Sequence, residues 1–262
     1  MSDTFTFDSM YINSMWMIAA ACLLPPLMYY IFYVYRRNLK QLAVLTGLAA
    51  YAVFGYILPG FVVPGISGAV PRALYIACSE VAGIFIAFKL TAKAWDTNAN
   101  AFGLTVGFAV IPIIIMRGFT AMSKLAIVTS LNDTGYSALA ESMPTENRAA
   151  LDDMLTALAN ETTAQHMLIA AEYLCAFALI VGITRLIWYS FHGERREPNI
   201  MFVFAALLLR SLAEIFYQTP YSIVSECAYY VVSLAAFAAS VLAAKFWDEP
   251  ERFTERLSGK RL

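Results

Sequence analysis

Residues 73–93 have the sequence ALYIACSEVAGIFIAFKLTAK, which is apolar enough to form a helix across a lipid bilayer. A transmembrane helix needs about 18 or more consecutive, mostly apolar residues. The stretch also contains Glu80, and a carboxylate inside the hydrocarbon costs about 2.5–3.5 kcal/mol on insertion scales. Glu80 therefore requires a partner, a bound proton or a function.

Six further apolar segments flank this stretch on both sides. They cover about residues 13–35, 41–63, 101–117, 165–190, 199–217 and 221–246. The chain is 60% hydrophobic and only 14% charged, whereas soluble domains have about 25% charged residues. We therefore expect an all-α, polytopic membrane protein with seven transmembrane helices, surrounded by lipid. The net charge of −1 gives no reason to expect a nucleic-acid partner.

Two of the segments contain features that disturb a regular helix. Pro25 and Pro26 predict a kink in the first segment, and Pro112 predicts a bend in the fourth. Beyond Arg117 and Gly118, the half-apolar stretch TAMSKLAIVTSLN is predicted to continue the fourth helix as a second piece.

The one sizeable polar region lies at residues 132–163, between the fourth and fifth segments. Within it, TENRAALDDMLTALANE predicts an amphipathic helix, with Thr145 as its cap and Leu151, Leu155 and Leu158 on one face. This helix either packs on the bundle or docks a partner. We expect one helical domain over 1–262, with this insertion and a tail at 247–262.

Basic residues predict the orientation, because cytoplasmic loops are enriched in Lys and Arg. One side has Arg72 and Arg148. The other side has Arg36, Arg37, Lys40, Lys89, Lys93, Arg185, Arg195, Arg196, Lys245, Arg252, Arg256, Lys260 and Arg261. We therefore expect the N-terminus and residues 132–163 outside, and the C-terminus in the cytoplasm.

Ionisable residues of both signs fall within or beside the predicted helices. They are Glu80, Arg117, Lys124, Glu172, Arg210, Glu214 and Glu226. Arg210 and Glu214 are four residues apart and share a helix face, so Glu80 or Glu226 could complete a cluster with them. Such a cluster either fixes helix packing as a buried ion-pair network or lines a polar cavity for a substrate, peptide or proton.

Several chemistries fit the sequence poorly. A zinc site would need His166 with carboxylates, because the only other histidine, His192, lies in a predicted loop. A Ser–His triad would depend on that same histidine at a helix end. The predicted spans contain no aspartate for an aspartyl dyad. Lys245, at the end of the seventh helix, is poorly placed for a retinal Schiff base, and we expect no cofactor.

The whole chain resembles the YhfC family of bacterial membrane proteins, relatives of the CAAX-type glutamic intramembrane proteases. The likeness lies in the helix layout and in three short stretches with altered residues. SEVAG has Ser79 and Gly83 where the family's E-E-x-x-R-like motif has a glutamate and an arginine, and it keeps Glu80. GFTAMSK has Phe119 and Ser123 at the His and Glu positions of a G-H-G-x-x-E-like stretch. Arg210 and Glu214 replace an H-x-x-x-D-like pair.

The resemblance implies a protein of the bacterial cytoplasmic membrane whose catalytic histidines and one glutamate are missing. Phe119 cannot transfer a proton, and Arg210 stays protonated and cannot act as a base. We therefore expect a catalytically degenerate protein that binds a membrane protein or peptide through its helices, rather than an enzyme. Two alternatives stay open: an active glutamic-type or metal-dependent protease using Glu80, Glu226 and His166, and a transporter or a subunit of one.

Overall fold

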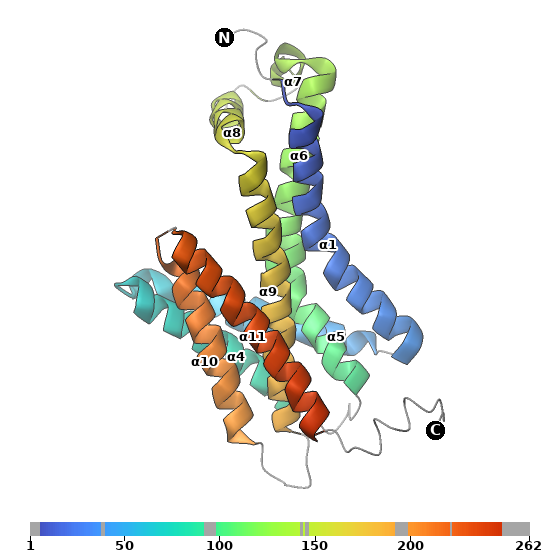
Figure 1. The fold of residues 1–262 in the computed structure, drawn as a ribbon, viewed down its shortest axis with the longest axis vertical. Coiled ribbons are helices and arrows are strands. Elements are labelled where there is room, and N and C mark those ends of the chain that lie inside the picture. The colour runs from blue at the N-terminus through green and yellow to red at the C-terminus, as the bar shows by residue number, and fades with distance from the viewer. Residues whose placement is uncertain are drawn as a thin grey trace. The chain divides into compact units, whose positions relative to one another are not determined.

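The computed structural model describes residues 6–37, 40–91, 98–141, 144, 147–191, 199–220 and 222–247, and the elements within these ranges are all helical (Figure 1). Thr145, His192 and nearly all of the predicted tail at 247–262 lie outside the described residues. The longer helices near the start of the chain are α1 (Ser9–Arg37), α2 (Gln41–Ala50) and α4 (Ala69–Thr91). The last two are α10 (Ile200–Gln218) and α11 (Ile223–Trp247).

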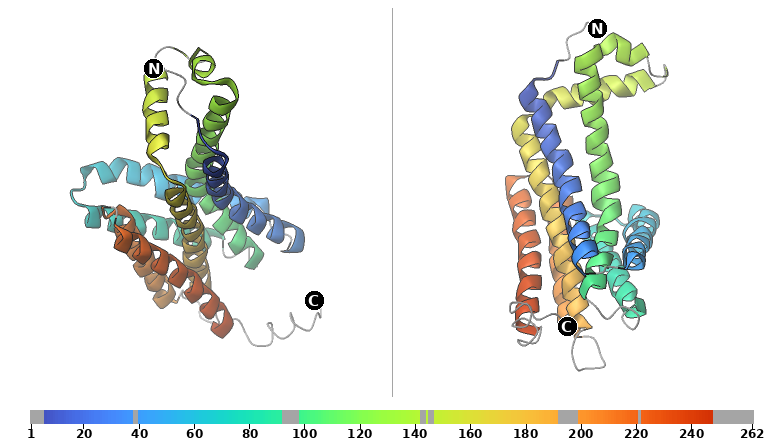
Figure 2. Two further views of the ribbon diagram at one scale, coloured as in Figure 1. Left: turned by 45° about the horizontal axis from the view of Figure 1, so that its top comes forward. Right: turned by 90° about the vertical axis from the view of Figure 1, so that its right-hand side faces the viewer.

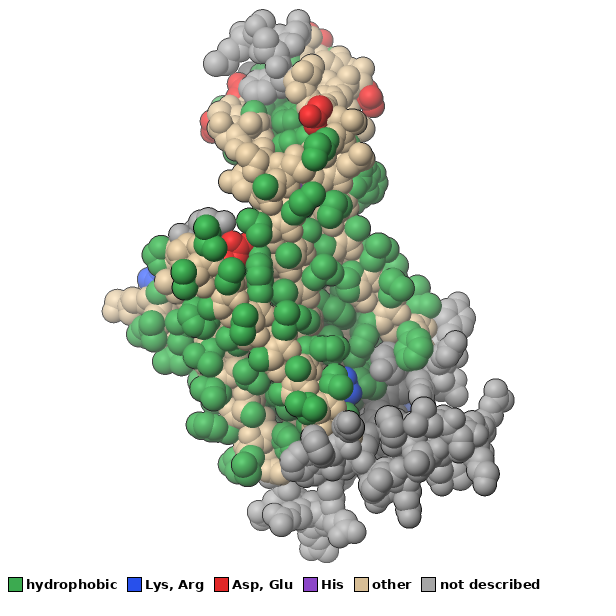
Figure 3. All heavy atoms as spheres, viewed as in Figure 1, with side chains coloured by type: hydrophobic (Ala, Val, Ile, Leu, Met, Phe, Trp, Pro, Cys, Tyr) green, Lys and Arg blue, Asp and Glu red, His purple; other side chains and the backbone are tan. Residues whose placement is uncertain are grey.

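Seven helical segments in this part of the chain are long and apolar enough to cross a membrane. They are Ser9–Phe32, Gln41–Gly65, Ala69–Thr91, Ala101–Thr134, Thr163–Ser190, Ile200–Gln218 and Ile223–Ala244. The predicted all-α class and the seven spans are therefore confirmed. Hydrophobic side chains cover the visible face of α10 and α11 (Figure 3), and Phe204, Val231 and Leu234 are among the exposed ones. The orientation of the termini stays a prediction.

The fourth span is continuous rather than broken at Gly118. α5 (Asn98–Ala109) passes through the π-helical segment η3 (Val110–Gly118) into α6 (Phe119–Thr134) without leaving helical geometry. The predicted extension after Gly118 is therefore α6, and it belongs to the same span. Pro112 lies inside η3, where the wider π-helical hydrogen-bonding pattern accommodates a residue that has no backbone N–H.

The chain divides into two compact units, each built from separate parts of the sequence. The first unit contains residues 1–25 and 112–174, with α6, α7 (Tyr136–Glu141), α8 (Arg148–Asn160) and the start of α9 (Thr163–Ser190). The second contains residues 26–111 and 175–262, including η1 (Tyr51–Ile57), α3 (Leu58–Val62) and the 3-10 turn η2 (Val63–Gly65). That the chain forms one domain stays a prediction.

In the first unit, α8 is the amphipathic helix expected from the sequence, and it runs across the end of α6 (Figure 2). Leu151, Leu155 and Leu158 are all buried. Leu158 packs in one cluster with Tyr11 of α1, and Leu151 and Leu155 pack in another. The helix begins at Arg148, and Asn147 occupies the cap position without a side-chain cap hydrogen bond. The apolar face, rather than a cap, therefore holds α8 in place.

α7 and α8 are also joined by a polar contact. The Tyr136 hydroxyl donates a hydrogen bond to Asp152 Oδ1 at 2.5 Å, and this bond raises the pKa of Tyr136. Tyr136 therefore stays protonated throughout the neutral range, and the contact does not depend on pH there.

In the second unit, α2 and α5 cross so closely that two glycines are required. A Cβ built on Gly47 would lie 2.0 Å from the Leu104 carbonyl oxygen, and one on Gly107 would lie 1.9 Å from the Val44 carbonyl oxygen. Small residues allow such close backbone approach between membrane helices. The crossing is therefore sterically closed to any other residue type at these positions.

We expect Gly47→Ala and Gly107→Ala to destabilise the protein by about 1–3 kcal/mol each, because the added methyl group forces the two backbones apart. Thermal unfolding in mild detergent would measure the loss. Gly60→Ala is the matched control, since a Cβ added at Gly60 would meet nothing within 4 Å. An equal effect of all three substitutions would contradict the argument.

Candidate functional site

Arg210 joins α4 to its own helix through two carboxylates in the second unit. Its Nε donates to Glu80 Oε2 at 2.7 Å, and its NH1 donates to Glu214 Oε2 at 2.7 Å. All three side chains are at most 14% exposed. Gln218 Nε2 donates to the other Glu214 oxygen at 2.8 Å. Sequence spacing predicted the Arg210–Glu214 contact, and the structure adds Glu80 as the third member.

Two neighbours of Glu80 in the sequence, Ser79 and Gly83, hold α4 against the π-helical segment η1. The Ser79 hydroxyl donates to the Phe54 carbonyl oxygen at 2.5 Å. A Cβ on Gly83 would lie 2.6 Å from Phe54 Cβ, so the missing side chain leaves room for the Phe54 ring. Ser79 and Gly83 therefore have packing roles, and together they fix the helix that carries Glu80.

The remaining charged residues predicted for the cluster have separate partners. Arg117 pairs with Glu172 at 3.5 Å, and Lys124 pairs with Glu161 at 3.3 Å. Glu226 accepts a hydrogen bond from the Tyr230 hydroxyl at 2.5 Å. These charged residues therefore do not form one cluster: Glu80, Arg210 and Glu214 bond together, and the others have separate partners.

Phe119 and Ser123 lie one turn apart on the exposed face of α6. Phe119 is 60% exposed, and Ser123 is exposed as well. Neither residue lines the two cavities of the first unit or the groove of the second. In the structure, these two positions therefore present their side chains to the surroundings of the first unit.

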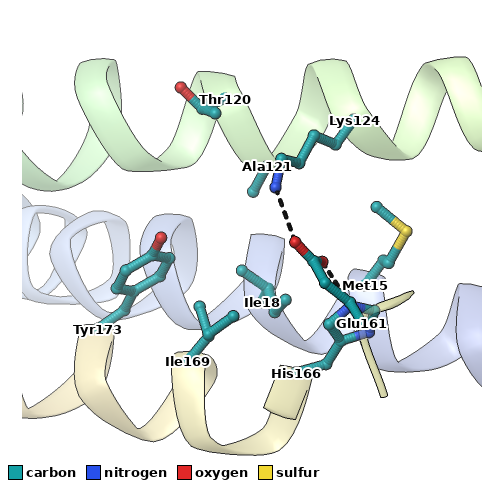
Figure 4. A pocket seen from close by; sticks show the side chains of 9 residues that line it. All are labelled: Met15, Ile18, Thr120, Ala121, Lys124, Glu161, His166, Ile169 and Tyr173. Carbon is teal, nitrogen blue, oxygen red and sulfur yellow. Dashed lines mark hydrogen bonds and ion pairs between the residues drawn. The ribbon is translucent and has the colours of Figure 1, made fainter. Parts of the chain in front are cut away.

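A second polar site surrounds His166 in the first unit, and the sequence analysis, which considered His166 with other carboxylates, did not predict its partners Ser14 and Glu161. His166 is fully buried, with Nδ1 at 2.7 Å from Ser14 Oγ and Nε2 at 3.0 Å from Glu161 Oε2. Lys124 and His166 both point toward Glu161 (Figure 4). A small cavity of about 60 Å³ adjoins them, and its lining is Met15, Ile18, Thr120, Ala121, Lys124, Glu161, His166, Ile169 and Tyr173.

Ser14, His166 and Glu161 are the residue types of a hydrolytic triad, but the arrangement does not activate the serine. Ser14 Oγ lies 2.6 Å from the Tyr11 carbonyl oxygen, which can only accept a hydrogen bond. The single hydroxyl proton therefore points to Tyr11 and away from His166. Ser14 is 2% exposed and does not line the cavity, so a substrate would not reach its oxygen.

A larger, open crevice lies on the other side of Glu161. Its volume is about 480 Å³, and it is lined by Thr6, Phe7, Asp8, Tyr11, Ala159, Glu161, Thr162 and Thr163. Glu161 thus lines both this crevice and the small cavity next to His166. Among the described residues, no three His, Cys, Asp or Glu side chains gather as a metal site would require.

An apolar groove runs along α4 and α10 in the second unit. Its volume is about 660 Å³, and its lining is Cys78, Val81, Ala82, Phe85, Ile86, Lys89, Ile200, Val203 and Leu207. On α4 these positions recur at helical spacing and form one continuous stripe. Lys89, at one end, is the only charged residue of the lining.

Comparisons of the chain with protein-family models, with curated proteins and with solved structures gave no match.

We expect Arg210→Leu to destabilise the protein by about 3–5 kcal/mol, because it leaves two buried carboxylates without their cation. Thermal unfolding in detergent would measure the loss. Glu226→Gln is the matched control, because among the described residues this carboxylate is bonded to a tyrosine hydroxyl and to no cation, and the change should cost about 0.5–1.5 kcal/mol. Equal stability of Arg210→Leu and the wild type would show that the cluster is in contact with water.

Proposed function

We propose that the chain is a non-proteolytic, multi-pass protein of the bacterial cytoplasmic membrane that binds a transmembrane helix of another protein. The proposal keeps the YhfC-like resemblance seen in the sequence as an ancestry and assigns the site a binding role. One observation carries the proposal: Arg210 forms salt bridges to both Glu80 and Glu214.

A general base must take a proton in the course of the reaction. Protonation of Glu80 would weaken its charge-assisted hydrogen bond from Arg210, whose own charge is permanent. In the same cluster, Gln218 donates to Glu214 and occupies its second oxygen. These contacts favour a structural carboxylate that fixes α4 against α10.

The two helices fixed in this way are the walls of the apolar groove, which supports the second half of the proposal. From Cys78 to Lys89 the groove follows α4 for 11 residue steps, or about 16 Å at a rise of about 1.5 Å per residue. That length is about half of the hydrocarbon core. Cys78 and Ala82 are small, and small residues allow helices to approach closely in a membrane.

The groove favours a partner helix of a particular composition. Its apolar lining fits an apolar helical face, and Lys89 at one end fits a carboxylate on the partner. Under the predicted orientation, Lys89 lies toward the cytoplasm, so the acidic residue would follow the cytoplasmic end of the partner's span. A phospholipid with its phosphate on Lys89 is the competing occupant, and cross-linking separates the two.

The protease alternative finds less support in the geometry. Its three residues have different partners: Glu80 is bonded to Arg210, Glu226 to Tyr230, and His166 to Ser14 and Glu161. The transporter alternative depended on a broken fourth helix and on charges near the middle of the membrane. Residues 98–134 are helical throughout, and the charges of Glu80, Arg210 and Glu214 are paired with one another. Neither alternative is therefore carried by a specific contact.

Cross-linking from a native cysteine tests the partner directly. Cys78 lines the groove and is exposed, and Cys227 is exposed on α11. We expect a thiol-attached photo-cross-linker at Cys78 to trap a membrane protein, identified by mass spectrometry, in cells that express the chain. The same reagent at Cys227, in a variant lacking Cys78, is the matched control. Cross-links to lipid alone would overturn the proposed occupant.

Filling the groove should displace the partner. We expect Ala82→Trp to abolish co-purification of the cross-linked protein, because the indole ring occupies the groove beside Val81 and Phe85. Ala235→Trp adds the same side chain at an exposed position of α11 and should leave the complex intact. Equal loss in both variants would indicate general misfolding, and retention in both would place the partner elsewhere.

Cleavage assays separately test the claim that the chain is not a protease. We expect no cleavage of the partner by the wild-type chain when the two are co-expressed. Cleavage that Glu80→Gln abolishes would contradict the proposal and restore the protease interpretation, whatever the cross-linking result.

A further inference from the structure

The contacts of His166 require one more proton than a neutral histidine and a carboxylate together supply. Ser14 donates its only hydroxyl proton in a hydrogen bond to the Tyr11 carbonyl oxygen, at 2.6 Å. Ser14 Oγ can then only accept from His166 Nδ1, which lies 2.7 Å away. We therefore assign a proton to Nδ1 from the hydrogen-bond network.

The other ring nitrogen faces a carboxylate. His166 Nε2 lies 3.0 Å from Glu161 Oε2, and an ionised carboxylate can only accept hydrogen bonds. A proton must lie between these two atoms as well. Lys124 Nζ, at 3.3 Å from Glu161 Oε1, favours the ionised carboxylate and so places this proton on the imidazole.

We propose that Glu161 and His166 form a proton-binding site in which His166 is an imidazolium when α8 is docked. The site is independent of the proposed partner groove, because all of its residues belong to the first unit. The ligand is a proton, and the open crevice that Glu161 lines gives it a route from bulk water.

The proton-binding site lies where α8 is attached to its neighbours. Glu161 is the C-cap residue of α8. Beside it, the Tyr11 hydroxyl donates to the Leu158 carbonyl oxygen at 2.6 Å, and the Tyr11 ring stands edge-on to His166 with centroids 4.6 Å apart. Glu161 therefore joins α8 to α9 through His166 and to α6 through Lys124, and the former link requires the proton.

Other titratable groups around the site do not replace this proton. Asp8 accepts from the Tyr11 backbone N–H at 2.6 Å. Arg117 and Glu172 pair with each other. The Tyr136–Asp152 contact keeps its proton in the neutral range because that hydrogen bond raises the pKa of Tyr136. Histidine is the side chain whose charge ordinarily changes between about pH 5 and 8.

The sign of the pH effect follows from the contacts. The docked state holds the proton, whereas an undocked Glu161 and His166 face water and have no need to share it. Docking therefore takes up a proton, because an unprotonated Nε2 would face the carboxylate with no hydrogen between the two atoms.

Amide hydrogen exchange of residues 148–160 at pH 5.5 and pH 8, corrected for the intrinsic pH dependence of exchange, tests the proposal. We expect protection of α8 to fall on the order of tenfold at pH 8, the effect of losing one hydrogen bond to a charged group. Glu161→Gln is the decisive variant. Its amide can donate to an unprotonated Nε2, so the pH dependence should disappear while the helix stays docked.

His192→Gln is the matched control, because it changes the only other histidine in the sequence and should leave the pH dependence unchanged. The same pH dependence in Glu161→Gln as in the wild type would overturn the proposal. If Glu161→Gln fails to fold, nitrogen-15 NMR of the wild-type imidazole decides. Two protonated ring nitrogens at pH 5.5 support the proposal, and a neutral ring of either tautomer overturns it.

Discussion

The position of α4 in the second unit depends on the bridge from Arg210 to Glu80 and Glu214. Three charged groups buried among apolar side chains are stable only when their hydrogen bonds are satisfied together. Arg210 meets this condition with two bonds of 2.7 Å, one to each carboxylate. A guanidinium suits the task because its donors form a rigid fork and its charge does not vary. The cluster thereby fixes both the distance and the rotation of α4 relative to α10.

The contacts of η1 complete this constraint from the other side of α4. Ser79 binds the Phe54 carbonyl oxygen, and Gly83 leaves space for the Phe54 side chain. A π-helical segment leaves backbone carbonyls outside the regular α-helical pattern, and a serine on the neighbouring helix can satisfy one of them. The same short stretch of α4 therefore contains a packing serine, a bridging glutamate and a contact glycine. Ser79 and Gly83 therefore both have definite packing roles in the folded protein.

The sequence predicted the seven spans because the bilayer imposes a length and an apolar composition on each helix. It also predicted the pair Arg210–Glu214, since residues four apart share a helix face. Contacts between helices could not be predicted in the same way. Glu80 and Arg210 are separated by 130 residues, and Ser14 and His166 by 152. No local pattern encodes such pairings. The Glu80–Arg210 contact was therefore predicted only as one of two possibilities, and the Ser14–His166 contact was not predicted. A histidine at the start of a predicted span, with a carboxylate five residues before it, was the available signal.

The two polar sites solve the problem of a buried carboxylate in opposite ways. Glu80 and Glu214 are balanced by an arginine, whose charge is permanent, so their contacts persist at any pH at which the carboxylates are ionised. Glu161 is balanced by a lysine and by a histidine, and a histidine, unlike an arginine, exists in both charged and neutral forms. The first arrangement is suited to a fixed wall of a binding groove. The second leaves the attachment of α8 responsive to protons, and the difference lies in the choice of cation rather than in the backbone around it.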